Sequence, residues 1–161
     1  MADRRNGRGK APEVESPVMF TIGYEGRGIH DFLGQLKERR VEILLDIRDN
    51  PISRNRDFCK SRLELVLARE GIRYEHMKGL GTPKPIRDQF KMSGNKERFV
   101  RSFDKFLATR GDDLNSLYAE VITSVCCVMC VERDPEWCHR SLVGERIRTL
   151  NGHDVSVVHI Q

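Results

Sequence analysis

The stretch that decides the fold is residues 124–150, SVCCVMCVERDPEWCHRSLVGERIRTL. It opens with the apolar run 124–131, which predicts a strand buried on both faces. A polar loop follows, turns at Asp134-Pro135 and ends at Cys138-His139-Arg140, where a helix is predicted to begin. A thiol, an imidazole and a guanidinium therefore meet at a helix N-terminus beyond the carboxyl end of a strand. Ligands bind at this place in open α/β sheets.

The rest of the chain alternates between strand and helix patterns. Further strands are predicted at residues 18–22, 41–47, 72–76 and 155–160, and helices at residues 29–39, 61–70, 86–110 with a break near Ser93-Gly94, and 113–123. Ser61 with Glu64 is expected to form a capping box, Asp112 or Asp113 to cap the later helix, and Gly71 to end a helix in a left-handed conformation. The fold class is therefore α/β: a Rossmann-like three-layer sandwich with a mostly parallel sheet of about five strands.

Length and charge set the domain organisation. The chain has 161 residues, a formal net charge of +4 and a pI of about 8.9. This size predicts one α/β domain, residues 17–161, and the mild basic bias fits a phosphate-bearing partner such as a nucleic acid or nucleotide. Residues 1–16 carry several arginines and read as a disordered basic arm. A solvated tail is favoured over a nucleic-acid-binding arm.

No apolar run approaches the roughly 20 residues that cross a bilayer, and the N-terminal segment lacks the hydrophobic centre of a secretory signal. A cytoplasmic protein without a membrane partner is predicted. The five cysteines are expected to be reduced there, because their number is odd and Cys126, Cys127 and Cys130 crowd one strand.

The first predicted strand runs into a glycine-rich turn, residues 23–28, that permits close approach of a ligand to the backbone. Its glycine order is not that of the dinucleotide fingerprint, and the chain contains no GxxxxGK[ST] phosphate loop. We therefore expect no dinucleotide cofactor and predict no other cofactor.

Several ordered motifs carry a resemblance. They are Thr21-Ile22-Gly23-Tyr24-Glu25-Gly26, Asp46-Ile47-Arg48 with Pro51 and Ser53-Arg54, Phe58 with Lys60, and Val131-Glu132-Arg133-Asp134-Pro135 followed by Cys138-His139-Arg140. Together they resemble the family called domain of unknown function 488, over roughly residues 18–160. The resemblance implies a small Rossmann-like domain and little about activity.

Parallel strands point the same way, so the loops after three of them are expected to meet at one edge of the sheet. Asp46 or Glu132 would serve there as the acid/base group, and Cys138 with His139 as the nucleophile. The residues predicted to bind substrate or phosphate are Tyr24, Gly26, Arg48, Ser53, Arg54, Lys60 and Arg140. The alternative is a set of ion pairs that pin the loops, for example Asp46 with Arg140.

Cys138 has two readings of equal weight. The helix N-terminus, His139 and Arg140 would favour a reactive thiolate, whereas burial would make the thiol inert. Zinc binding by Cys130, Cys138 and His139, with His76 or His153, is the less favoured reading. The chain has no CxxC pair and no HExxH, and adjacent Cys138-His139 rarely bind one ion. We therefore predict no metal site, and core packing for Cys126 and Cys130, which share a strand face.

These features favour a small enzyme that acts on a nucleic acid or another phosphate-bearing substrate, in processing, repair, or base or phosphodiester chemistry. Hydrolase, lyase and glycosylase activities all fit. Two alternatives remain open: a non-catalytic nucleic-acid-binding module, and a thiol-based transferase or redox protein that uses Cys138.

Overall fold

The computed structural model describes residues 15–152 and 154–161, with the side chain of residue 151 left aside. Within these residues the chain forms a five-stranded sheet in the order β3-β2-β4-β1-β5, and every pairing is parallel. The strands are β1 (Val18–Gly23), β2 (Ile43–Asp46), β3 (Arg73–His76), β4 (Cys126–Cys130) and β5 (Ser156–Ile160). The predicted α/β class and parallel sheet are confirmed, although β2 and β4 are shorter than their apolar runs.

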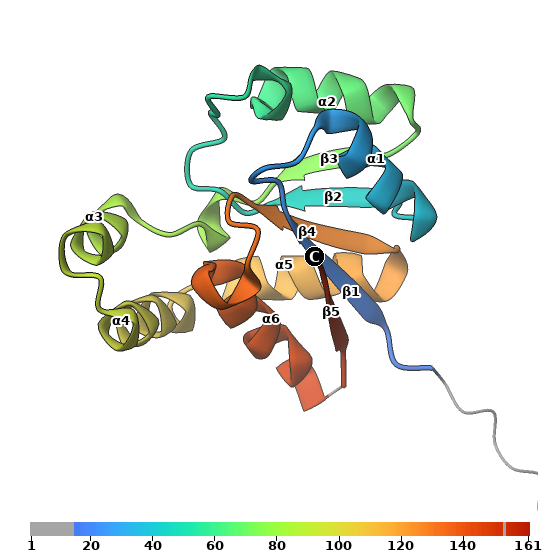
Figure 1. The fold of residues 1–161 in the computed structure, drawn as a ribbon. Helices are drawn as coiled ribbons and strands as arrows, with labels where there is room; N and C mark the ends of the chain where they lie inside the picture. The colour runs from blue at the N-terminus through green and yellow to red at the C-terminus, as the bar shows by residue number, and fades with distance from the viewer. Residues whose placement is uncertain (1–14, 153) are drawn as a thin grey trace, which may run out of the picture.

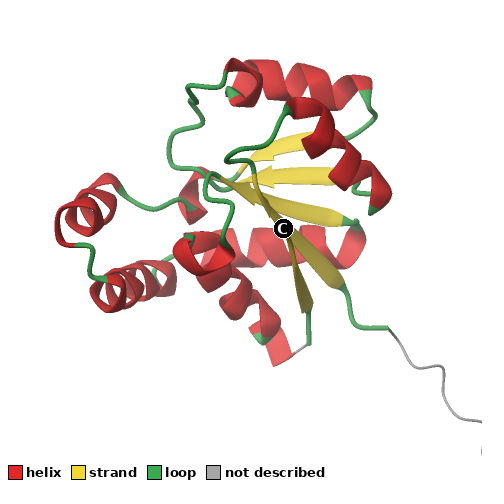
Figure 2. Ribbon diagram, in the orientation of Figure 1, coloured by secondary structure: helices red, strands yellow, loops and turns green. Residues whose placement is uncertain are grey.

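Helices cover both faces of the sheet and give three layers (Figure 2). The α-helices of the described chain are α1 (Ile29–Glu38), α2 (Lys60–Arg69), α3 (Lys84–Ser93), α4 (Lys96–Ala108), α5 (Gly111–Thr123) and α6 (His139–Arg148). Short 3₁₀ turns are η1 (Arg56–Phe58), η2 (Lys78–Leu80), η3 (Pro135–Trp137) and η4 (Leu150–Gly152). Helices α1 and α2 lie on one face, and α5 and α6 lie on the other (Figure 1).

The face under α1 and α2 is one apolar cluster. Phe32 and Leu36 of α1 and Leu63 and Leu67 of α2 are fully buried there against the sheet. Their helical spacing is the reason these segments form amphipathic helices. Full burial of each such side chain contributes about 1.5–3 kcal/mol relative to exposure.

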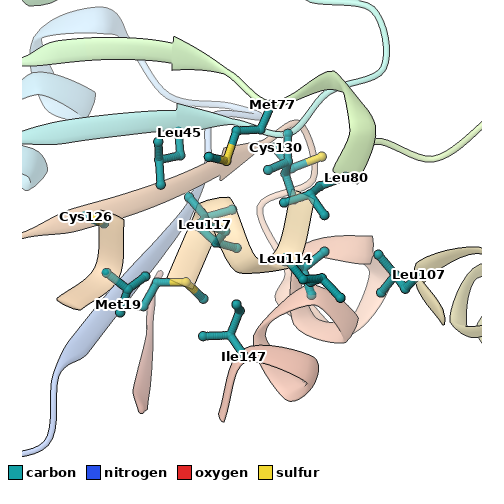
Figure 3. Packing of buried hydrophobic residues seen from close by; sticks show 14 of the residues in the cluster. Met19, Leu45, Met77, Leu80, Leu107, Leu114, Leu117, Cys126, Cys130 and Ile147 are labelled. Atoms are coloured by element: carbon teal, nitrogen blue, oxygen red, sulfur yellow. The ribbon is translucent and has the colours of Figure 1, made fainter. Parts of the chain in front are cut away.

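The opposite face is a second cluster, which contains Leu114 and Leu117 of α5 and Ile147 of α6 (Figure 3). Cys126 and Cys130, at the two ends of β4, both belong to it, so they share one face of the strand, as the period of two predicts. Their predicted core packing is therefore confirmed. Cys130 sits at the carboxyl end, next to the site described below.

Helices α3 and α4 form a hairpin beyond the carboxyl ends of β2, β3 and β4 (Figure 1). The predicted break near Ser93-Gly94 is confirmed: Gly94 has φ +61° and ends α3 in the left-handed conformation. Phe90 of α3 packs on Phe99 of α4, with ring centroids 4.8 Å apart. No side chain of α3 is fully buried, so one of its faces is left to line a cavity.

Two predicted caps are wrong. Helix α2 begins at Lys60, one residue before Ser61, and Cys59 is its N-cap without a side-chain hydrogen bond. The preceding chain fixes this start, because the Lys60 amide donates to the Pro51 carbonyl at 3.0 Å. The N-cap of α5 is Arg110, and Asp113 forms an ion pair with it at 2.7 Å instead of capping the helix. Gly71 has φ +73°, as predicted.

Residues 1–14 of the predicted basic arm and His153 lie outside the described residues. Within the described part, none of the helices combines the length and the apolar character that crossing a membrane requires.

Candidate functional site

The strand register brings the motif loops together. Gly23 pairs with Cys130, and Asp46 pairs with Met129, so β1, β2 and β4 end at the same edge. The predicted meeting of these loops is therefore confirmed. Contact is closest at Gly23, where a Cβ atom would lie 1.8 Å from the Glu132 carbonyl oxygen. Only glycine permits the loop after β4 to cross this position.

A cavity of about 260 Å³ opens beyond this edge, between the loops after β2 and β4 and the α3–α4 hairpin. We call it the Trp137 cavity. Its lining residues are Arg48, Asp49, Asn50, Thr82, Arg87, Phe90, Lys91, Phe99, Cys130, Val131, Glu132, Trp137 and His139. Of the predicted site residues, Arg48, Glu132 and His139 reach it.

Asp46 does not line the cavity, because its side chain is fully buried and hydrogen-bonded inside the protein. Its carboxylate accepts hydrogen bonds from Arg48 Nε at 2.8 Å, Arg48 Nη2 at 2.6 Å, the Arg48 amide at 3.1 Å and the Tyr74 hydroxyl at 2.7 Å. Four acceptor positions are all that a carboxylate offers. The geometry therefore assigns Asp46 a structural role in place of the predicted acid/base role.

The electrostatics of this cluster follow from burial and charge. Burial opposes the charge of Arg48, but its hydrogen bonds and Coulomb attraction to Asp46 outweigh this and raise its pKa. Burial, followed by the Asp46 charge, raises the pKa of Tyr74. Arg48 also donates to the Phe58 carbonyl at 2.9 Å and to the Tyr24 hydroxyl at 3.3 Å. The guanidinium of Arg48 is thus held rigidly by Asp46, Phe58 and Tyr24.

Arg140 is fully buried and does not reach the cavity. Its guanidinium donates to the carbonyl oxygens of Glu132 and Arg133 and, from Nε at 3.2 Å, to the Thr21 hydroxyl. The predicted phosphate-binding role is therefore replaced by a structural one: Arg140 fastens the loop after β4 to β1. The ion pair suggested between Asp46 and Arg140 does not form, because each side chain has other partners.

The remaining predicted substrate residues lie off the cavity. Tyr24 is buried and stacks on Phe58 with ring centroids 4.4 Å apart, and Gly26 serves a turn with φ +71°. Ser53 shapes the loop by accepting from the Asn55 amide at 3.1 Å. Arg54 is exposed in the loop before η1 and Lys60 is exposed at the start of α2, and neither borders the Trp137 cavity.

Cys138 and His139 lie at the start of α6, and both are buried. Burial raises the pKa of Cys138 well above its usual value, and neighbouring Cys130 adds to the shift. Contact with His139 acts in the opposite direction and lowers this pKa in part. Burial therefore favours the thiol form of Cys138 over a thiolate stabilised by the helix N-terminus.

His139 is oriented by the backbone. Its Nε2 lies 3.1 Å from the Ile47 carbonyl oxygen, and its ring packs edge-on against Phe103. Burial lowers the pKa of His139, but contacts with Cys138, the Ile47 carbonyl and Glu132 outweigh it, so the pKa is raised. The other ring nitrogen, Nδ1, lies 3.5 Å from the Cys130 sulfur.

Comparison with protein families matches residues 28–147 to the family described as domain of unknown function DUF488. The chain belongs to the DUF488 family. No curated protein and no solved structure matches it. The predicted family is thereby confirmed, and the match spans the loops after β2 and β4 and the whole α3–α4 hairpin.

Sequence reasoning missed the wall that this DUF488 chain builds from α3 and α4. Arg87 and Lys91 are one helical turn apart in α3, and Phe90 lies between them. The spacing of Phe99 predicts a core residue only, yet this side chain both packs against the core and lines the cavity. A usable signal was present: α3 mixes basic and aromatic residues and lacks the apolar stripe of a core helix.

The mouth of the cavity in the DUF488 chain is basic and aromatic. Trp137 is 53% exposed, and the Lys96 ammonium lies 4.7 Å from its ring centroid. Arg87 Nη1 is 3.6 Å from the Asp49 carboxylate. His76, a suggested metal ligand, bonds through Nε2 to the Arg48 carbonyl at 2.7 Å and does not line the cavity.

Proposed function

We propose that this protein is an enzyme acting on a nucleic acid or nucleotide, with the Trp137 cavity as its site. One observation carries the proposal: the cavity joins a basic mouth, an exposed aromatic ring and a deep acid/base pair. Those are the parts that bind a phosphate, hold a base and move a proton.

The basic mouth suits a phosphate. Arg87 and Lys91 come from successive turns of α3 and line the same cavity. The separation of 3.6 Å between Arg87 and Asp49 exceeds the 2.7–2.9 Å or so of a direct charge-assisted hydrogen bond. A phosphate group can therefore compete with Asp49 for the guanidinium.

The aromatic wall suits a base. An indole face next to an ammonium group is a sequence-tolerant surface for an unpaired base, and stacking contributes about 1–3 kcal/mol per base. The volume of about 260 Å³ is below the ~300–1,000 Å³ of drug-sized sites. It therefore fits a single base with its sugar and phosphate better than the end of a duplex.

The interior of the cavity holds the chemistry. Glu132 and His139 both line it, and Glu132 is only partly buried and can meet substrate. We assign Glu132 as the general base that would activate a water, which fits hydrolysis of a phosphodiester or a glycosidic bond.

The five cysteines are all free, in keeping with a cytoplasmic protein.

The test is fluorescence anisotropy of labelled single- and double-stranded DNA and RNA, titrated with the full chain across a salt series. We expect binding to single strands that falls steeply with salt. Trp137→Ala should weaken it about 5- to 150-fold, the equivalent of about 1–3 kcal/mol. The double variant Arg87→Ala/Lys91→Ala should weaken it further and reduce the salt slope.

The matched control is Lys37→Ala/Arg69→Ala, which removes the same charge from the ends of α1 and α2, at the opposite edge of the sheet. Equal loss in both double variants would show non-specific attraction and overturn the assignment of the cavity. Product formation that disappears in Glu132→Gln would establish catalysis. Binding without turnover in any substrate would instead favour the non-catalytic nucleic-acid-binding module.

A further inference from the structure

Four potential metal ligands converge at the inner end of the Trp137 cavity. The ligand atoms of Cys130, Glu132, Cys138 and His139 all lie within 4.8 Å of one another. Cys130 contributes from the end of β4, Glu132 from the loop that follows it, and the other two from the start of α6. We propose that these residues form a site for a divalent cation of the zinc class.

The spacing is that of a tetrahedral site. With Zn–S bonds of about 2.3 Å and Zn–N or Zn–O bonds of about 2.0–2.2 Å, neighbouring ligand atoms of a tetrahedron are about 3.5 Å apart. The Cys130 sulfur lies 3.5 Å from His139 Nδ1 and 3.5 Å from Glu132 Oε2. Only small side-chain movements would therefore bring all four groups onto one ion.

Adjacent residues seldom ligate one ion, but the local backbone explains the exception. Cys138 has extended angles, φ −122° and ψ 139°, whereas His139 is the first residue of α6. The change from extended to helical backbone at this point turns both side chains toward Cys130. The sulfur and the ring nitrogen thereby come within 4.8 Å of the other ligand atoms.

The ring of His139 is already oriented to bind a metal ion through Nδ1. A neutral His139 that donates from Nε2 to the Ile47 carbonyl at 3.1 Å carries its free lone pair on Nδ1, the nitrogen nearest Cys130. Metal-bound histidines commonly donate their second nitrogen to a backbone carbonyl in this way. This contact is independent of the cysteine spacing and points to the same ion position.

Burial gives the site a closed side and an open side. Cys130, Cys138 and His139 are 3%, 4% and 7% exposed, respectively. Glu132 is less buried and lines the cavity, so the carboxylate occupies the exchangeable position: it binds the ion in the resting site and leaves it to act as the base proposed above when a substrate or water takes that position. Three buried nitrogen and sulfur ligands with one exchangeable position are the arrangement of catalytic zinc sites.

The first experiment uses the full chain, reduced and freed of metal with a chelator, and titrates it with Co²⁺ in place of Zn²⁺. We expect one ion per chain, with sulfur-to-cobalt charge-transfer bands and the intense visible bands of tetrahedral cobalt, all displaced by Zn²⁺. A wild-type spectrum without charge-transfer bands overturns the proposal, and no variant is needed for this result. Because no substrate is present, the outcome is independent of the proposed function.

Variants then locate the ion. Cys130→Ser and Cys138→Ser should each weaken Zn²⁺ binding about 100-fold or more, since loss of even a supporting contact costs about 10–100-fold. Cys126→Ser is the matched control: it removes a buried thiol from the same face of β4 but outside the cluster, and binding should be unchanged. Circular dichroism establishes that each variant is folded. Equal binding in all three folded variants would place the ion elsewhere and overturn the site.

Discussion

The guanidinium of Arg48 donates to both carboxylate oxygens of Asp46, at 2.8 and 2.6 Å, and the side chains are 3% and 0% exposed, respectively. Because two residues separated by one position close this pair, it forms a rigid corner where β2 runs into the loop of the cavity. The same arginine reaches Tyr24 and Phe58, so one ion pair ties three segments together.

Asp46→Asn should destabilise the protein strongly. It leaves the buried Arg48 charge without its counter-ion, which costs about 3–5 kcal/mol in comparable buried pairs. Urea unfolding followed by circular dichroism measures the loss. Asp104→Asn is the control: it breaks the exposed pair with Arg146 and should cost less than about 1 kcal/mol. A folded, fully stable Asp46→Asn protein would return Asp46 to the catalytic candidates.

Gly23→Ala should be among the most damaging small substitutions in the chain. The added methyl group would lie 1.8 Å from the Glu132 carbonyl oxygen and 2.5 Å from the carbonyl carbon, both backbone atoms that cannot turn aside. We expect a loss of about 3 kcal/mol or more, at the upper end of the range for overpacking. Thermal melting measures it.

Gly34→Ala provides the opposite expectation in the same experiment. Gly34 lies inside α1, and a methyl group added there would meet nothing within 4 Å. Because alanine favours helix over glycine, this variant should gain about 0.5–1 kcal/mol. Similar melting temperatures for the two variants would show that the loop after β4 can move away from β1.

Sequence patterns predicted the sheet and the edge at which the motif loops meet, because apolar runs and helical spacing are local properties. The roles of Asp46 and Arg140 could not be read in the same way, since they depend on which partners fold against them. Arg140 has an attractive position beside Cys138, yet its guanidinium turns inward to two backbone carbonyls. The motifs therefore predicted which loops meet better than which of their charged residues face the cavity.

The residues that line the cavity show the same limit of sequence analysis, because their role there also depends on the folded structure. Phe99 follows the helical spacing of a core residue, and it does pack on the core, but its helix projects beyond the sheet and exposes it to the cavity as well. The cluster of Cys130, Cys138 and His139 depends on the backbone change at the start of α6. Spacing rules for metal motifs do not describe such a change.

The thiols should be alkylated in the order of their exposure to solvent, with the least buried thiol first. With a chelator present, Cys59 should be alkylated first, because it is only partly buried. Burial raises the pKa of Cys126 to about 12 and holds that of Cys138 well above its usual value, so both should react slowly at neutral pH. Peptide mass spectrometry over a time course reads the order. Rapid modification of Cys138 below pH 7 would support the thiol-based transferase or redox protein instead.

Protonation of His159 should lower the free energy of unfolding of the protein in mild acid. Thr21 accepts from Arg140 Nε, so its hydroxyl proton is free to bond to His159 Nδ1 at 2.6 Å, and that nitrogen must be unprotonated. Burial, followed by the charges of Arg140 and Arg148, lowers the pKa of His159 below its usual value.

The folded state therefore binds fewer protons at this residue than the unfolded chain does. Its stabilising contribution is present above about pH 6.5, the value for an unperturbed histidine, and is lost as the pH falls through the lower folded value. Urea unfolding at closely spaced pH values should show a shallower decline in His159→Gln than in the parent protein over this window. His30→Gln, an exposed position on α1, is the control and should follow the parent. An unchanged decline in His159→Gln would mean that another group is responsible for the acid sensitivity.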